Sequence, residues 1–155
     1  MAVGSVQICL TGSFRDDRGV TTERFLTPLN IQPDEEVESS RADGGKWQSG
    51  VVYFPVTRLR DFATAEEPSE AFFAQLKQRL LAIARFLDNR PPAVTVALRS
   101  SGMELRLIID VWMDQDQMEL ELPPELLAAC SRHGLPVYII SNDFSAAEVL
   151  EWRSV

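Results

Sequence analysis

Carboxylates gather around one tryptophan in the last third of the chain. They are Glu104, Asp110, Asp114, Asp116, Glu119 and Glu121, on either side of Trp112. Carboxylates steer a basic partner toward a surface, and tryptophan is among the residues that contribute most to binding energy. We therefore expect a surface that binds the Lys or Arg groups of a partner protein. Trp47, in an earlier polar stretch, is a second expected contact.

Other chemistries fit this cluster less well. The D-x-D-x-x-E-x-E spacing from Asp114 to Glu121 lacks the glycine and the closing glutamate of an EF-hand loop, so we predict no metal. Asp110 and Glu121 can share acid and base roles only inside a cleft, which a flat sheet face does not provide. No G-x-S-x-G or phosphate-loop sequence is present. We expect a non-enzymatic domain without a cofactor.

One histidine and two cysteines limit the possible sites further. His133 is the only histidine, which excludes histidine-rich zinc sites and two-histidine iron sites. It stands next to Gly134, where we expect it to contact carbonyl groups at a helix end. Cys9 and Cys130 lie far apart and outside any C-x-x-C pair, so we interpret both as small apolar residues with reduced thiols.

The chain is acidic, and its acidity is concentrated. Its 155 residues include 23 acidic and 15 basic side chains, a net charge of −8. Residues 1–100 hold 12 basic and 13 acidic side chains, whereas residues 101–155 hold 3 and 10. Such a chain repels nucleic-acid phosphates.

The N-terminus lacks a basic signal-peptide region, and no apolar run approaches the roughly 20 residues of a membrane helix. We expect a cytoplasmic protein, monomeric or homodimeric, that binds neither nucleic acid nor membrane.

Apolar periodicity predicts much of the secondary structure. Residues 6–11 alternate as in a half-buried strand, and residues 51–56 form a short expected edge strand. Residues 69–88 repeat apolar side chains at spacings of three and four, which predicts the main helix. Residues 32–50 are polar and unpatterned, so this loop is either functional or disordered. The expected inward residues of the helix are Phe72, Phe73, Leu76, Leu80, Leu81, Ile83, Ala84 and Leu87.

A three-strand antiparallel meander is expected next. Its first strand is 93–99, a turn follows at Ser101 and Gly102, its second strand is 104–113, and its third follows a turn at 114–117. This register gathers the carboxylates on the side of the sheet away from the helices. The alternative is ordinary solvated strand positions, with Trp112 packed against Ile108 and covered by the segment around Trp152. The expected cross-strand pairs are Arg99 with Glu104, Val111 with Leu120, Asp110 with Glu121, and Trp112 with Glu119.

Capping signals predict the rest of the chain. Pro123 and Pro124 begin a helix that Gly134 ends, and residues 135–140 form a strand. Ser145 and Glu148 form the capping box of a closing helix. We therefore expect a single α+β domain over residues 1–155. Its architecture is a two-layer sandwich, with a largely antiparallel sheet of about five or six strands and helices packed on one face.

The sequence L-N-I-Q-P at residues 29–33 follows a short expected helix that begins at Thr22. Together with the opening strand, the polar loop before Trp47 and the later elements, it resembles the bacterial domain-of-unknown-function 4279 family over most of the chain. The family pattern has glycine where this chain has Asn30, and asparagine also accepts the left-handed backbone. No catalytic residue is established for the family. By analogy, small acidic domains of this kind often accompany bacterial toxin genes as immunity proteins.

We hypothesise an immunity-type inhibitor that blocks a basic partner, such as a cognate toxin, through the acidic sheet face around Trp112. Two alternatives stay open. One is an enzyme or small-ligand sensor with a pocket between sheet and helices, closed by residues 32–50. The other is a homo-oligomer that pairs through the edge strand at 51–56. A cavity lined by convergent polar groups favours the enzyme or sensor.

Overall fold

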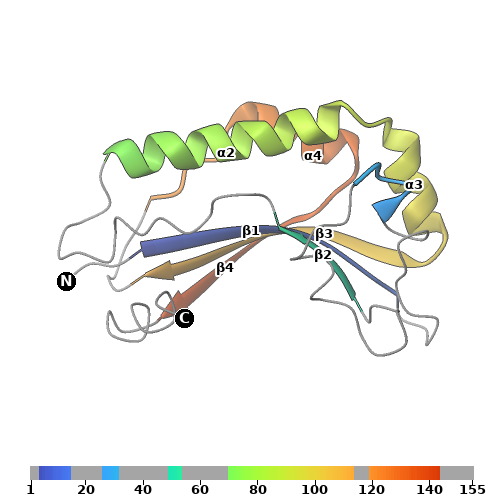
Figure 1. Cartoon of the computed structure of the whole chain (residues 1–155), viewed down its shortest axis with the longest axis horizontal. Coiled ribbons are helices and arrows are strands. Elements are labelled where there is room, and N and C mark those ends of the chain that lie inside the picture. The colour runs from blue at the N-terminus through green and yellow to red at the C-terminus, as the bar shows by residue number, and fades with distance from the viewer. Residues whose placement is uncertain (1–3, 15–25, 32–48, 54–69, 114–118, 144–155) are drawn as a thin grey trace.

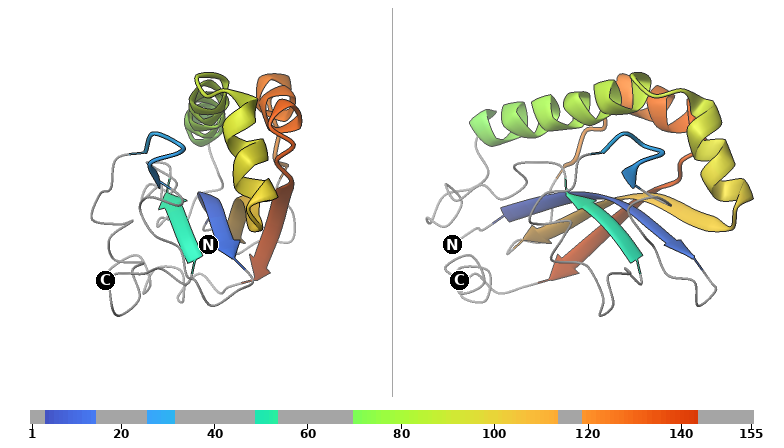
Figure 2. Two further views of the ribbon diagram at one scale, coloured as in Figure 1. Left: turned by 90° about the vertical axis from the view of Figure 1, so that its right-hand side faces the viewer. Right: turned by 45° about the vertical axis from the view of Figure 1, so that its right-hand side comes forward.

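Seven helices and strands make up the described part of the chain. The computed structural model describes residues 4–14, 26–31, 49–53, 70–113 and 119–143. The strands form one sheet, and α2 and α4 lie side by side over one of its faces (Figure 1, Figure 2). The fold is therefore α+β, as predicted. The elements are β1 (Gly4–Phe14), β2 (Ser49–Tyr53), α2 (Glu70–Asp88), α3 (Pro92–Ser100), β3 (Met103–Met113), α4 (Pro124–Arg132) and β4 (Val137–Asp143).

The sheet is mixed, with the strand order β2-β1-β3-β4. β1 runs antiparallel to both β2 and β3, whereas β4 runs parallel to β3. Parallel neighbours need a crossover connection, which α4 provides between β3 and β4. β2 and β4 are the edges of the described sheet. The described residues form four strands, so the predicted five or six are not reached within them.

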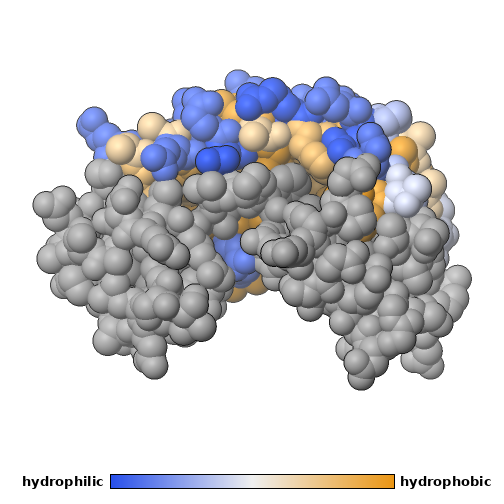
Figure 3. Space-filling model, viewed as in Figure 1, coloured by the Kyte–Doolittle hydropathy of each residue, from blue (hydrophilic) through white to orange (hydrophobic). Residues whose placement is uncertain are grey.

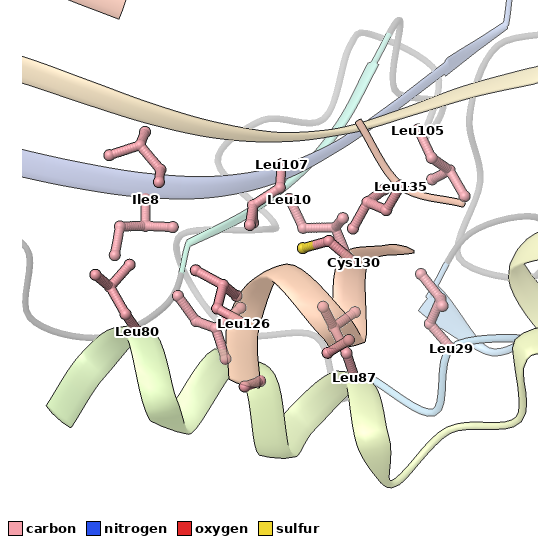
Figure 4. Close-up of a cluster of buried hydrophobic side chains, with 14 of the residues drawn as sticks. Ile8, Leu10, Leu29, Leu80, Leu87, Leu105, Leu107, Leu126, Cys130 and Leu135 are labelled. Carbon is pink, nitrogen blue, oxygen red and sulfur yellow. The ribbon is translucent and has the colours of Figure 1, made fainter. Parts of the chain in front are cut away.

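Alternation along β1 and β3 produces the apolar inner face of the sheet. Figure 4 shows Ile8 and Leu10 of β1 on one side of the core, with Leu80 of α2 and Leu126 of α4 on the other. The strand predicted at 6–11 and the inward positions predicted along 104–113 are confirmed wherever the side chains are described. The buried inward residues are Val6, Ile8, Leu10, Met103, Leu105, Leu107, Ile109 and Val111.

Helix α2 confirms the main predicted helix. Its apolar stripe faces the sheet, and its outer side, at the top of Figure 3, is mostly hydrophilic. Phe73 and Leu81 lie at the margins of the stripe and are only partly buried. Residue Ser69 of the predicted helix lies outside the described residues. The buried residues of α2 are Phe72, Leu76, Leu80, Ile83, Ala84 and Leu87.

Residues 93–99 are helical, so the strand predicted there is wrong. They belong to α3, which buries Thr95 and Leu98 at a helical spacing. α3 begins with Pro92 after the N-cap residue Pro91, just as α4 begins with Pro124 after Pro123, and proline at the first helical position is preorganised for a helix. Pro91 and Pro123 even share backbone angles, with φ of −63° and −59°. The consecutive β-branched residues Val94, Thr95 and Val96 favour a strand locally, but the two prolines favour the start of a helix.

The expected turn at Gly102 exists, but it joins a helix to a strand. Gly102 has φ +95°, a conformation that residues with a Cβ rarely adopt. The predicted pair of Arg99 with Glu104 is wrong, because α3 leaves the plane of the sheet. Arg99 instead donates a hydrogen bond to the carbonyl oxygen of Gly134, and Glu104 pairs with Arg106.

Residues 119–122 do not form the third strand of a meander. β3 already lies between β1 and β4, so the sheet has no position for another strand beside it. The backbone neighbours of Asp110 are Gln7 and Ile140, from β1 and β4. The predicted pairs Val111 with Leu120, Asp110 with Glu121, and Trp112 with Glu119 are therefore wrong.

The C-terminal elements agree better with prediction. α4 begins after Pro123, and His133 is its C-cap residue. Gly134 follows with φ +59°, the left-handed conformation expected just past a helix end. The strand predicted at 135–140 is confirmed as β4, which begins at Val137.

Some predicted features lie outside the described residues. They are the start of the short helix at Thr22, the loop up to residue 48, residues 54–56 of the edge strand, the turn at 114–117, and the closing helix with its capping box at Ser145 and Glu148. Ser49 and Gly50, assigned to the loop by their composition, belong to β2.

The turn at residues 27–30 uses a left-handed residue. Asn30 has φ +53°, so the conformation expected of it as a replacement for glycine is confirmed. Arg90, just after α2, ties this turn to the helix layer. Its guanidinium donates hydrogen bonds to the carbonyl oxygens of Leu29, Asn30 and Phe86.

Substitutions at Asn30 test this turn. We expect Asn30→Val to lower the free energy of unfolding by about 1–2 kcal/mol, because a β-branched residue is strained at positive φ. We expect Asn30→Gly to be neutral or mildly stabilising, since glycine adopts this conformation freely. Urea denaturation measures both. Asn89→Val, at an exposed residue without positive φ, is the control; an equal loss there would contradict the explanation.

Candidate functional site

The structure separates the residues that the sequence placed on one acidic face. Glu104 and Asp110 lie on the side of the sheet away from the helices, and Trp112 is a further residue of the same strand, β3. Glu119 and Glu121 lie in the extended segment between β3 and α4. Trp47, Asp114 and Asp116 lie outside the described residues, as does the Trp112 side chain. The predicted site is thus divided between two surfaces.

Asp110 lies in an environment that disfavours its charged form. It is half-buried, and its strand neighbours are Gln7 and the apolar Ile140. Burial raises the pKa of the Asp110 carboxyl above its ordinary value of 3.8. Within the described part of the chain, no basic side chain pairs with it. A half-buried carboxylate without a cation is a candidate for binding one from outside.

Arg106 is the one basic residue of β3, but it is paired with groups other than Asp110. Its Nη2 atom lies 3.2 Å from a carboxylate oxygen of Glu104. Its guanidinium also lies over the ring of Tyr138 on β4, 4.9 Å from the ring centroid. Arg106 therefore neutralises Glu104 rather than Asp110.

A groove lies between α2 and the segment that precedes α4. Its volume is about 330 Å³. The apolar part of its wall comes from Phe73 and Leu76, and its charged part from Glu119, Glu121 and Lys77. The described residues include no ion-pair partner for either glutamate. Ala74 and Pro123 complete the described lining. The groove thus combines an apolar wall with two carboxylates and one ammonium group.

The sequence pattern E-L-E-L explains why Glu119 and Glu121 are predicted to lie on a sheet face although they do not. Leu120 and Leu122 pack against the hydrophobic core, while Glu119 and Glu121 are exposed. Alternation therefore predicted correctly which side chains turn inward. It could not predict whether the segment would pair with a strand, because the same alternation suits any extended chain lying on a core.

His133 has a structural position at the junction of the three helices. Its side chain is 1% exposed. Its Nε2 atom lies 2.7 Å from the carbonyl oxygen of Leu87, and its Nδ1 atom lies 3.0 Å from the hydroxyl of Thr95. A carbonyl only accepts, so Nε2 donates to Leu87, while the Thr95 hydroxyl lies within hydrogen-bond distance of Nδ1 and of the carbonyl oxygen of Pro92, which is 2.9 Å away. The contact expected with carbonyls at the end of its own helix is made instead with a carbonyl in the last turn of α2.

The cysteines are buried, as their interpretation as apolar residues implies. Burial raises the pKa of the Cys130 thiol to about 11, so the unreactive thiol form dominates at neutral pH. No group of three or more His, Cys, Asp or Glu residues in the described ranges is arranged to hold a metal ion. Among the helices described, none has the length and apolar character to cross a membrane.

The chain matches no protein-family model, no curated protein and no solved structure. The resemblance to the domain-of-unknown-function 4279 family therefore stays a prediction from the motif and the element order.

The raised pKa of Asp110 predicts a pH-dependent gain from its removal. A carboxyl that is harder to ionise when folded stabilises the protein at low pH, and that stability is lost as the pH rises from 3.8 through the folded pKa. We expect Asp110→Asn to unfold at higher urea than the parent at neutral pH, and the difference to vanish below pH 3.8. Glu121→Gln, which removes an exposed carboxylate, is the control. A difference that does not change with pH would contradict the burial effect.

The Thr95 hydroxyl is expected to stabilise the helix junction. Thr95→Val keeps the side-chain shape but leaves His133 Nδ1 buried without its hydrogen-bond partner, which costs about 1–3 kcal/mol. Thr95→Ser restores the hydroxyl, so we expect it to recover most of the loss. Chemical denaturation compares the three proteins. Equal stability of the valine variant and the parent would show that this hydrogen bond contributes nothing.

Proposed function

We propose that this chain is a non-enzymatic protein-binding domain that takes up a Lys- or Arg-bearing segment of a basic partner in the groove between α2 and residues 119–123. The observation that carries the proposal is the combination of Glu119 and Glu121 with an apolar wall in one groove. Long basic side chains are apolar along their stems and charged at their ends. A groove with both characters complements them.

The balance of charge within the groove supports a cationic occupant. Two carboxylates face one ammonium group, that of Lys77, so the described lining has an excess of one negative charge. The chain as a whole, at −8, adds a long-range attraction for a basic protein. The half-buried Asp110 on the other side of the sheet offers a second, independent contact for a cation.

The mechanism we propose is steric and electrostatic blockade of the partner. In this proposal the protein acts in the cytoplasm, and its class is that of immunity-type inhibitors, with a cognate toxin as the partner. The acidic composition and the family resemblance favour this class. The corrected position of the glutamates changes the contact surface, from a flat sheet face to a groove.

Binding of a simple probe tests the groove. We expect a labelled peptide of alternating arginine and leucine to bind the protein, and its glutamate-leucine counterpart not to bind. Glu119→Gln and Glu121→Gln are each expected to weaken binding by about two- to fivefold, the worth of an exposed ion pair. Lys77→Gln is expected to strengthen it, because it removes a like charge. Fluorescence anisotropy at low and high salt measures all of them.

The matched control is Glu125→Gln, which removes one exposed carboxylate of α4 that does not line the groove. We expect it to leave binding nearly unchanged. If it weakens binding as much as Glu119→Gln, attraction is a property of total charge and the groove is not the site. If the arginine-leucine peptide fails to bind the parent protein, the proposal is wrong.

The volume of the groove favours one second candidate, a small cationic ligand such as a polyamine. Small-molecule sites begin at about 300 Å³, and the groove reaches about 330 Å³. Competition with spermine separates the two functions. Displacement of the peptide by spermine, with tighter binding of spermine itself, favours ligand sensing. If spermine displaces the peptide only weakly, and added salt displaces it to the same extent, the result favours protein binding.

A further inference from the structure

Strand β4 is an exposed apolar edge. Among the described strands, β4 pairs only with β3. The exposed fractions of Tyr138, Ile139 and Ile140 are 43%, 54% and 41%. Tyr138 and Ile140 share the side of the sheet away from the helices, and Ile139 lies on the other side. Both faces of this edge are therefore apolar and accessible at the same place.

The sequence of β4 lacks the usual protections of an edge. Proteins discourage strand addition with a lysine or proline within the edge strand, or with a bulge. The seven residues of β4 include no basic residue and no proline, and their pairing with β3 is regular. The only charged residue of β4 is the last, Asp143. Within the described ranges, no strand pairs with the outer side of β4, so the described structure leaves that side to another strand.

We propose that a second copy of this chain occupies the edge, through antiparallel pairing of the two β4 strands about a twofold axis. Symmetry selects the orientation, because two identical strands that pair in one sheet about a twofold axis run antiparallel. A twofold, self-complementary contact is also the commonest way in which identical chains associate.

Symmetry and burial together select the register. A twofold axis perpendicular to the sheet relates the two β4 strands, so one residue must lie opposite its own copy. Both helix layers then lie on the same side of the joined sheet. Placing Ile139 opposite Ile139 brings Tyr138 of each copy opposite Ile140 of the other. All three exposed apolar residues then cover one another, and the Tyr138–Ile140 contact is an aromatic with β-branched pair, which stabilises sheets. The two four-stranded sheets become one continuous sheet.

The first test is the mass in solution. Analytical ultracentrifugation of the parent protein over the micromolar range is expected to show a concentration-dependent dimer. Ile139→Lys is expected to be monomeric, because in the proposed register it places two positive charges directly opposite each other. Val96→Lys, at an α3 residue that is 50% exposed, is the control and is expected to stay dimeric. Thermal unfolding of each variant verifies that it is folded.

The second test is disulfide formation under mild oxidation, which reports the register. Directly opposite residues of an antiparallel pair have Cα atoms about 4.5–5.5 Å apart, within the range of a disulfide. We expect Ile139→Cys to form a covalent dimer. Ser141→Cys is not expected to, because its two copies would lie roughly 13 Å apart along the strands. The native cysteines are buried and do not interfere.

Three results would overturn the proposal. If the parent protein is monomeric over the whole concentration range, a second copy does not occupy the edge, and a strand of another protein becomes the candidate. A dimer that survives Ile139→Lys uses a different surface. Equal cross-linking of Ile139→Cys and Ser141→Cys excludes the proposed register. This edge is separate from the groove on α2, so each proposal stands or fails without the other.

Discussion

The antiparallel pairing of β1 with β3 is the interaction on which the rest of the structure depends. It joins 11 residues of each strand without a break, from Gly4 with Met113 to Phe14 with Met103. A slip of one residue would turn every inward side chain outward. In the observed register, Val6, Ile8 and Leu10 lie beside Val111, Ile109 and Leu107 to form one buried surface. That surface determines which face the helices cover.

The helix layer is held to this surface by apolar packing and to itself by a few polar contacts. His133 connects the end of α4 to the end of α2 and to Thr95 in α3. Arg90 connects the end of α2 to the turn at Asn30. The contacts with Leu87, Leu29 and Asn30 use side-chain atoms to satisfy backbone carbonyls at the end of a helix or in a turn, whereas the contact with Thr95 joins two side chains. The single histidine thus serves the architecture, and the candidate chemistry lies elsewhere.

The distribution of charge follows from the path of the chain after β3. The segment 119–122 leaves the sheet and runs along the core toward α4, so its two glutamates face α2 rather than Asp110. This separation yields two surfaces with different properties. The groove is exposed and combines charge with apolar side chains, whereas the Asp110 face is partly buried and its nearby Arg106 is already paired. The first is better suited to capture a basic segment.

Short-range sequence patterns predicted the local features of this protein. The spacing of Phe72, Leu76, Leu80, Ile83 and Leu87 predicted α2, the alternation of β1 and β3 predicted their buried faces, and Asn30 was correctly expected to be left-handed. Each of these depends on residues close together in the chain. The tertiary structure alone decided which strands are neighbours, and therefore where the acidic residues lie. Strand pairing depends on competition between distant segments of the chain. Local alternation does not reveal which segments pair, because a paired strand, an extended segment such as 119–122 and a short helix such as α3 can all show it over a few residues.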